Sequence, residues 1–225
     1  MWRTVMDSGV DGGGSHSWVV PANEYRRERW LNQLGWTREI HRSPASGDWD
    51  WRLSIAEIEH DAPFSSFPGI DRELVLLSGN GLRLRFDDGE LQELAPPHGK
   101  LCFAGERGVT GELVDGPTHD FNLMWRRGRV QAELWHRPLV GQMVIFAEPR
   151  HIWAVHLISG HARFADDSGL APLETGDTAV LIAGSNRLRH VLDGGGEALL
   201  IRISPVGTGD VSSDMAETLR LQPAQ

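Results

Sequence analysis

Two neighbouring stretches of the chain carry side chains that could bind a small anion. The first, 51–54, alternates tryptophan and leucine with Arg52 and Ser54. The second, 63–72, combines two phenylalanines with prolines and a glycine, and ends in an Asp-Arg pair. An arginine guanidinium binds a carboxylate through two parallel hydrogen bonds, and a hydroxyl can add another. No standard catalytic motif appears elsewhere in the chain, so we expect a functional site here.

The sequence around these stretches predicts β-strands. Apolar and polar side chains alternate along 49–56, 82–87 and 120–125, which is the period of two expected of a strand. Turn signals separate the strands, among them 87–89 (Asp-Asp-Gly) and 96–97 (Pro-Pro). We therefore predict an all-β fold with few short helices.

One β pattern occurs twice in the chain. The segment 75–81 resembles 155–161, and 103–105 resembles 182–184, with nearly the same spacing in both cases. A β unit repeated once at this spacing predicts two similar barrels or sandwiches side by side.

Composition narrows the class of partner. The formal net charge of −9 argues against nucleic acid, because phosphate backbones require a basic surface. No apolar run approaches the roughly 20 residues of a membrane-spanning helix, and no N-terminal segment has the pattern of a secretion signal. The one cysteine, Cys102, cannot form an internal disulfide, and its apolar neighbours predict an inert core thiol. We expect a cytoplasmic protein with no nucleic-acid or membrane partner.

Motifs in four regions, in order along the chain, resemble a known family. They lie at 30–40, at 51–56, at 63–82 and at 120–127. Through these motifs, roughly residues 18–205 closely resemble the HutD/Ves family, bicupin proteins linked to histidine utilisation in bacteria. The resemblance implies two small cupin-like (jelly-roll) barrels packed together. It also implies a ligand pocket in the N-terminal barrel and no established catalytic activity.

The function implied by the resemblance is regulatory. The family is associated with limiting expression of the histidine-degradation operon, through binding of an intermediate such as formylglutamate. We therefore expect non-catalytic binding of a small anionic metabolite, with a carboxylate as the partner. A cupin-type enzyme acting on a small carboxylic acid is the alternative. A third possibility is an interaction protein whose barrels form a homodimer interface.

One departure from the family pattern concerns a glycine-rich triplet. In this chain the triplet reads Gln33-Leu34-Gly35, so only its last glycine is kept. If the triplet wraps a ligand with positive φ angles, Gln33 and Leu34 reshape that wall. The ligand could then differ from that of other members.

The strand around Arg52 allows two orientations. An antiparallel sheet ordinarily buries its apolar face, which would put Trp49, Trp51 and Leu53 inside and Arg52 in water. With the resemblance we favour the inverse, in which Arg52 and Ser54 face the barrel interior. The tryptophan face would then be buried against the second barrel.

The expected site follows from this inverted orientation. Arg38 and Arg52 are the expected carboxylate anchors, and Glu39, Asp71 and Asp120 are expected to hold the arginines in place. Arg72 either lines the pocket or forms a surface ion pair with Asp71. The full set of expected ligand-binding residues is Asn32, Thr37, Arg38, Glu39, Arg52, Ser54, Ser65, Phe67, Asp71, Arg72, Asp120, Asn122 and Met124.

We expect no metal, no cofactor and no catalytic residue. The His-x-His pair of metal-binding cupins is absent from the sequence. His151, His156 and His161 are five residues apart, so on a strand they alternate between faces. The nucleophile elbow Gly-x-Ser-x-Gly is also absent. Acid–base work by Glu39, Asp71 or Asp120 would need pKa values raised by burial.

The sequence predicts four segments. A flexible extension covers 1–16, and a barrel with the ligand pocket covers 17–130. A second barrel covers 131–210, and a tail or short helix covers 211–225.

Overall fold

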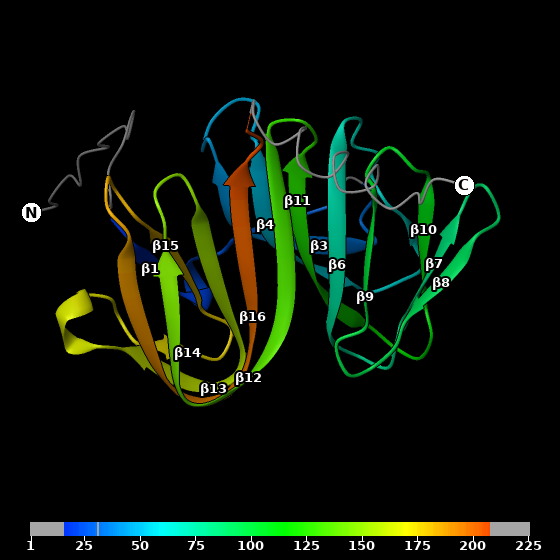
Figure 1. Cartoon of the computed structure of the whole chain (residues 1–225). Coiled ribbons are helices and arrows are strands. Elements are labelled where there is room, and N and C mark those ends of the chain that lie inside the picture. The colour runs from blue at the N-terminus through cyan, green and yellow to red at the C-terminus, as the bar shows by residue number, and fades with distance from the viewer. Residues whose placement is uncertain (1–15, 31, 208–225) are drawn as a thin grey trace, which may run out of the picture. The chain divides into compact units, whose positions relative to one another are not determined.

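The computed structural model describes residues 16–30 and 32–207 of the chain. They form three sheets of antiparallel strands, with only two short 3-10 turns, η1 (Ala22–Glu24) and η2 (Asp166–Ser168) (Figure 1). The predicted all-β class is confirmed. The expected extension over 1–16, apart from its last residue, and the expected tail over 211–225 lie outside the described residues.

The chain divides into two compact units. Of the described residues, the first unit comprises those of Tyr25–Glu133 and 203–207. The second unit comprises residues 16–24 together with Leu134–Arg202. The N-terminal strand β1 (Trp18–Val20) belongs to the second unit because it pairs with β15 (Thr178–Ile182), with Trp18 opposite Val180.

The first unit contains two sheets. The larger has the order β2-β3-β4-β11-β6-β9, and the smaller has the order β5-β10-β7-β8. The larger sheet consists of β2 (Arg26–Arg29), β3 (Gly35–Ser43), β4 (Trp51–Ile58), β6 (Ile70–Ser78), β9 (Lys100–Ala104) and β11 (Thr118–Arg126). The smaller sheet consists of β5 (Ala62–Pro63), β7 (Leu82–Phe86), β8 (Leu91–Leu94) and β10 (Val109–Leu113).

A hydrophobic core joins the two sheets of the first unit. Ile58 and Leu76 of the larger sheet belong to the same buried cluster as Leu84 and Phe86 of the smaller one. The strands predicted from alternation at 49–56, 82–87 and 120–125 correspond to β4, β7 and β11. Period-two patterning therefore located these strands, because each buries the apolar side chains of one face.

The second unit contains one sheet, with the order β1-β15-β13-β16-β12 and with β14 paired to β13. Figure 1 shows its long strands side by side. Besides β1 and β15, it consists of β12 (Val130–Ala147), β13 (Ile152–Phe164), β14 (Leu173–Glu174) and β16 (Leu188–Pro205). Its core is a cluster of apolar side chains that includes Val155, Leu157, Leu181 and Leu192.

The sequence repeat corresponds to a repeated strand pairing. In the first unit, Val75 of β6 lies opposite Lys100 of β9. In the second unit, the matching Val155 of β13 lies opposite Ala179 of β15. Each unit thus contains the same antiparallel ladder at equivalent places in the repeat. None of the three sheets closes on itself within 16–30 and 32–207, so the two closed barrels stay a prediction.

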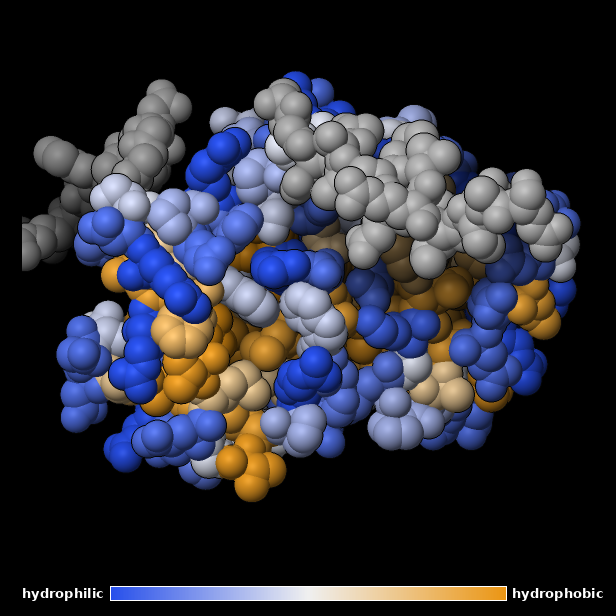
Figure 2. Space-filling model, viewed as in Figure 1, coloured by the Kyte–Doolittle hydropathy of each residue, from blue (hydrophilic) through white to orange (hydrophobic). Residues whose placement is uncertain are grey.

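Hydrophilic side chains cover much of the face drawn in Figure 2, with hydrophobic side chains visible between them. The described part of the chain contains no helix long and apolar enough to cross a membrane. The expectation that Cys102 is a core thiol is wrong, because Cys102 is exposed. Neighbouring residues on a strand face opposite ways, so the burial of Phe103 leaves Cys102 on the other face.

The core of the first unit gives a first prediction. Leu84 is fully buried on β7, whereas Leu91 on the paired strand β8 is 48% exposed. We expect Leu84→Ala to lower the free energy of unfolding by about 2–5 kcal/mol, because it leaves a cavity. Leu91→Ala should change it by less than about 1 kcal/mol. Urea denaturation of both variants measures this, and equal losses would contradict the assigned core.

Candidate functional site

The central strand β11 arranges the polar residues of the first unit in rows. Successive side chains on a strand alternate between faces, so Asp120, Asn122 and Met124 share one face. Met124 lies opposite Arg52 on β4 and Arg72 on β6. This cross-strand pairing brings two arginines, 20 positions apart in sequence, to either side of one methionine.

The next two rows follow the same register. Asn122 lies opposite Ser54 on β4 and Leu74 on β6. Asp120 lies opposite Ala56 and Leu76. Along this face of β11, the row of arginines is thus followed by a row with an amide and then by a row with a carboxyl group.

A cavity of about 430 Å³ lies over this face. Its lining brings together nine of the residues expected from the sequence: Asn32, Thr37, Arg52, Ser65, Phe67, Arg72, Asp120, Asn122 and Met124. It also includes Glu28, Arg29, Trp30, Ala56, Ile58, Pro63, Phe64 and Leu74. The structure places Arg52 on the cavity side of β4. Leu53 and Ile55 are buried on its other face, and the packing of that face against a second barrel stays a prediction.

Arg72 is a buried cation of the cavity lining, with 5% of its surface exposed. Its guanidinium lies between 5.2 and 5.7 Å from the ring centres of Phe64, Phe67 and Phe103. Burial, and then the charge of Arg52, lower its pKa to about 10, so the group is still a cation at neutral pH. Its buried Nε and Nη1 atoms have no hydrogen-bond partner among the residues that the structure describes.

Arg52 differs from Arg72 because it has an acid partner. Its Nε lies 2.7 Å from Oε2 of Glu39, and Nε of Arg42 lies 3.6 Å from the other oxygen of the same carboxylate. Glu39 therefore holds Arg52 in place, as expected. Glu39 itself lies outside the cavity lining.

Asp71 does not neutralise Arg72. It pairs with Arg127 instead, at 2.6 Å. The surface Asp71–Arg72 ion pair considered from the sequence is therefore wrong. The physical reason is strand geometry, since adjacent residues on β6 point to opposite faces.

Arg38 and Ser54 also lie outside the cavity lining. Arg38 lies opposite Ile55, and its Nε is 2.8 Å from Oε1 of Glu57. Arg72 rather than Arg38 therefore lies beside Arg52 on the cavity face. Ser54 is buried, with only 1% of its surface exposed.

Asp120 is a buried carboxyl group on the cavity lining. Burial raises its pKa to about 7, although a hydrogen bond from Thr118 opposes the shift. Oγ1 of Thr118 donates to Oδ2 of Asp120 at 2.6 Å. The other oxygen, Oδ1, and Oδ1 of Asn122 are buried without a hydrogen-bond partner in the described part of the chain.

Aromatic side chains and a tight turn form another part of the lining. Trp30 and Phe64 pack edge to face at 5.9 Å, and Nε1 of Trp30 donates to Oγ1 of Thr37 at 2.9 Å. In the turn between β2 and β3, Gln33 has a positive φ of 60°. Position 35 requires a glycine because β3 passes close to the backbone of Glu57: a Cβ at this position would lie 2.6 Å from the carbonyl oxygen of Glu57.

Besides Phe64, which lies in the stretch 63–72 singled out above, three polar or aromatic lining residues were not expected from the sequence. Trp30 had a signal, because it begins the first motif shared with the family. Glu28 and Arg29 had none, because they lie on a short strand with no alternation of apolar side chains.

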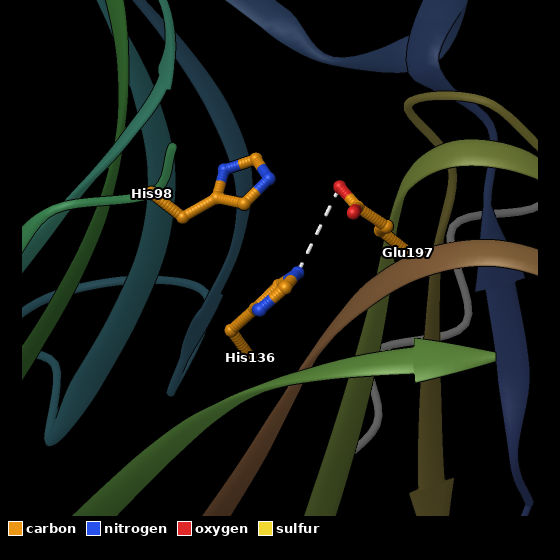
Figure 3. Close-up of side chains that lie close together, drawn as sticks. All are labelled: His98, His136 and Glu197. Atoms are coloured by element: carbon orange, nitrogen blue, oxygen red, sulfur yellow. Dashed lines mark ion pairs between the residues drawn. The ribbon is translucent and has the colours of Figure 1, made fainter. Parts of the chain in front are cut away.

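Among residues 16–30 and 32–207, the histidines and acids of each unit form no metal centre within that unit. In the second unit, Nε2 of His136 lies 3.8 Å from Oε2 of Glu197 (Figure 3). In the first unit, Nδ1 of His98 lies 3.1 Å from the carbonyl oxygen of Leu76. Within either unit taken alone, the described residues contain no group of three metal-ligand side chains. The expectation of no metal cofactor stays a prediction.

The fold and the lining residues define an all-β protein with a cavity that contains charged side chains. A family model described as HutD matches residues 22–200, so the chain belongs to the HutD family.

Relatives of known sequence agree with this assignment. An uncharacterized 21.2 kDa protein in the hutC 3' region of Pseudomonas putida is 39% identical over 118 residues, 52% of this chain and 62% of that protein. Protein Ves of Cronobacter sakazakii is 41% identical over 106 residues, 47% of this chain and 58% of that protein. The chain thus spans less than two thirds of the length of these curated relatives.

A solved structure agrees as well. HutD from Pseudomonas fluorescens SBW25, in a formate condition, is 28% identical to this chain, with a TM-score of 0.73. The match covers 85% of this chain and 100% of that one.

The buried carboxyl group gives a pH prediction. With the pKa of Asp120 near 7 in the fold, against 3.8 ordinarily, the folded protein holds a proton between these values that the unfolded chain releases. The contribution of Asp120 to stability therefore falls as pH rises from about 4 to 7. The free energy of unfolding of Asp120→Asn, relative to that of the wild type, should therefore rise by about 2 kcal/mol between pH 5 and pH 8.

Urea denaturation at both pH values measures this gain. The control is Asp48→Asn, because the side chain of Asp48 is 96% exposed, and it should follow the wild type at both pH values. A stability difference between Asp120→Asn and the wild type that is the same at both pH values would contradict the assigned titration.

Proposed function

We propose that the protein binds a small carboxylate in the cavity of the first unit and does not transform it. The observation that carries this proposal is Arg72. A buried cation without a partner is unfavourable unless an anion and hydrogen-bond acceptors are supplied. A bound carboxylate supplies both, and the planar guanidinium fits it with two parallel hydrogen bonds.

The charges of the cavity favour an anion at the row of arginines. Arg52 is already paired with Glu39, so the positive charge of Arg72 is the one that a ligand carboxylate would neutralise. The rings of Phe64, Phe67 and Phe103 around Arg72 exclude water. Exclusion of water strengthens the attraction between a guanidinium and a carboxylate.

The size of the cavity suits a metabolite. Small-molecule sites have volumes of about 300–1,000 Å³ and combine apolar walls with a few polar groups. The 430 Å³ cavity of the first unit has this composition. A second cavity, of about 460 Å³, lies in the second unit, and its lining contains none of the residues expected from the sequence to bind a ligand.

We further propose a regulatory role in histidine utilisation, with a formylglutamate-like metabolite as the ligand. Membership of the HutD family and the Pseudomonas putida relative from the hutC 3' region support this pathway. In this proposal the two units are the two cupin-like barrels of a bicupin, as the repeated β6–β9 and β13–β15 ladders suggest.

One observation favours a second function, the cupin-type enzyme. Burial raises the pKa of Asp120 to about 7, which suits a general acid or base at neutral pH. Incubating a bound carboxylate with the protein and following it by NMR distinguishes the two functions. A ligand recovered unchanged supports binding alone, and conversion that is lost in Asp120→Asn supports the enzyme.

Arg72 gives the test of the binding proposal. Isothermal titration calorimetry with formylglutamate, formiminoglutamate, glutamate and urocanate, each with and without a divalent metal, identifies a ligand. We expect metal-independent binding of at least one carboxylate. In Arg72→Met the binding should weaken by at least about tenfold, because a charge-assisted hydrogen bond contributes about 1.5–3 kcal/mol.

A matched control is Arg83→Met. Arg83 lies on β7, outside the cavity lining, and pairs with Glu93 at the surface. This variant should bind as the wild type does. Equal affinity in Arg72→Met and the wild type would contradict the proposed site, and binding only with metal would favour the enzyme.

A further inference from the structure

Two oxygen acceptors occupy the part of the cavity beyond the arginines. Asp120 and Asn122 both line the cavity, and each has a buried Oδ1 without a hydrogen-bond donor among the described residues. Asp120 is completely buried. A buried acceptor that lacks a donor costs free energy, so this part of the cavity requires a donor from outside the described chain.

The groups that face Asp120 do not supply this donor. Thr118, on the same strand, bonds only the other oxygen. The residues opposite Asp120 are Ala56 of β4 and Leu76 of β6, and Thr37 of β3 lies next in the row, opposite Ala56.

The charged groups of the lining lie on other strands, and among them Glu28 lies in the row of Asp120, beyond Ala56 and Thr37. They are Arg52 of β4, Arg72 of β6, and Glu28 and Arg29 of β2. The two arginines lie in the row of Met124, four positions from Asp120 along β11.

We propose that this end of the cavity selects ligands that carry an N–H donor in addition to their carboxylate, and that Asp120 determines this selectivity. The inference rests on the proposed function, because a carboxylate held by Arg52 and Arg72 directs the rest of the ligand along Asn122 and Asp120. The chemical class is an amino- or acylamino-carboxylate.

The charge of Asp120 explains which ligands are rejected. A second carboxylate at this end meets the Asp120 carboxylate, and like charges at close range disfavour each other. An apolar end leaves the buried acceptors without a donor. An N–H group satisfies an acceptor and, if cationic, also balances the negative charge.

Spacing sets the length of the probes. A strand rises about 3.4 Å per residue, so the rows of Met124 and Asp120 are about 14 Å apart along β11. The side chains of Arg52 and Arg72 extend over part of this distance, so several atoms must separate the carboxylate from the donor. Three carboxylates of similar length differ only at the far end. They are 5-aminopentanoate with an ammonium group, hexanoate with a methyl group and adipate with a second carboxylate.

Calorimetric titration of the whole chain at pH 8.5, where Asp120 is ionised, tests the selectivity. We expect 5-aminopentanoate to bind at least about tenfold more tightly than hexanoate, because only 5-aminopentanoate can donate a charge-assisted hydrogen bond to Asp120. Adipate should bind most weakly. Equal or tighter binding of hexanoate or adipate would overturn the inference.

The pH dependence of probe binding distinguishes selection by the charge of Asp120 from selection by the shape of the cavity. The pKa of Asp120 is raised by burial to about 7, so at pH 6 the group is mostly protonated. On going from pH 8.5 to pH 6 we expect 5-aminopentanoate to weaken and adipate to strengthen. The ammonium group of the probe, similar to that of lysine, stays charged at both values. The same trend for both probes would overturn the inference.

Two variants separate this inference from the proposed function. Asp120→Asn should reduce the preference for 5-aminopentanoate and abolish the opposite pH trends, while hexanoate binding shows that the variant is folded. Wild-type selectivity in Asp120→Asn would overturn the inference. Arg72→Met should weaken all three probes. Arg72-dependent binding without selectivity would leave the proposed function intact and overturn this inference, and binding of none of the probes would contradict both.

Discussion

The guanidinium of Arg72 is buried in the first unit without an acid partner among the residues described, and the rest of the cavity is organised around this charge. Three aromatic rings surround it, and the neighbouring Arg52 is neutralised separately by Glu39. A protein rarely keeps such a group for stability, because burying an unpaired charge is unfavourable. The arrangement is reasonable if the missing anion is the ligand, so that the unfavourable burial contributes to binding.

Strand register makes this arrangement possible. β11 lies between β4 and β6, and its cavity face meets Arg52 and Arg72 at one row and Ala56 and Leu76 at another. The cavity is therefore cationic at one end and lined by oxygen acceptors at the other. A shift of one residue in register would move each of these side chains to the opposite face. The buried apolar residues on the opposite face of the same strands, such as Leu53 and Leu123, fix the register.

The sequence predicted more of the fold than of the site. Alternation located β4, β7 and β11, and the repeated pattern corresponded to equivalent ladders in the two units. Of the nine expected lining residues, those on one strand, such as Asp120, Asn122 and Met124, share a face because they are two positions apart. Asn32, Ser65 and Phe67 lie in loops and were expected from the family motifs. Thr37 and Arg38 were both expected in the cavity lining, but adjacent residues of a strand point to opposite faces. Thr37 faces the cavity, and Arg38 therefore does not. The burial of Arg72 was not predictable, because it depends on the register of β6 with β11 and on the rings that pack around it.

The most direct test of the account is the NMR signal of the Arg72 side chain. The Nε–H resonance, assigned by its loss in Arg72→Met, can be followed as formylglutamate or another carboxylate that binds is added. We predict a large change in its chemical shift and slower exchange with water, with the same dissociation constant as that from calorimetry. A carboxylate that binds the protein and leaves this resonance unchanged would contradict the assignment of Arg72 as the anion-binding group.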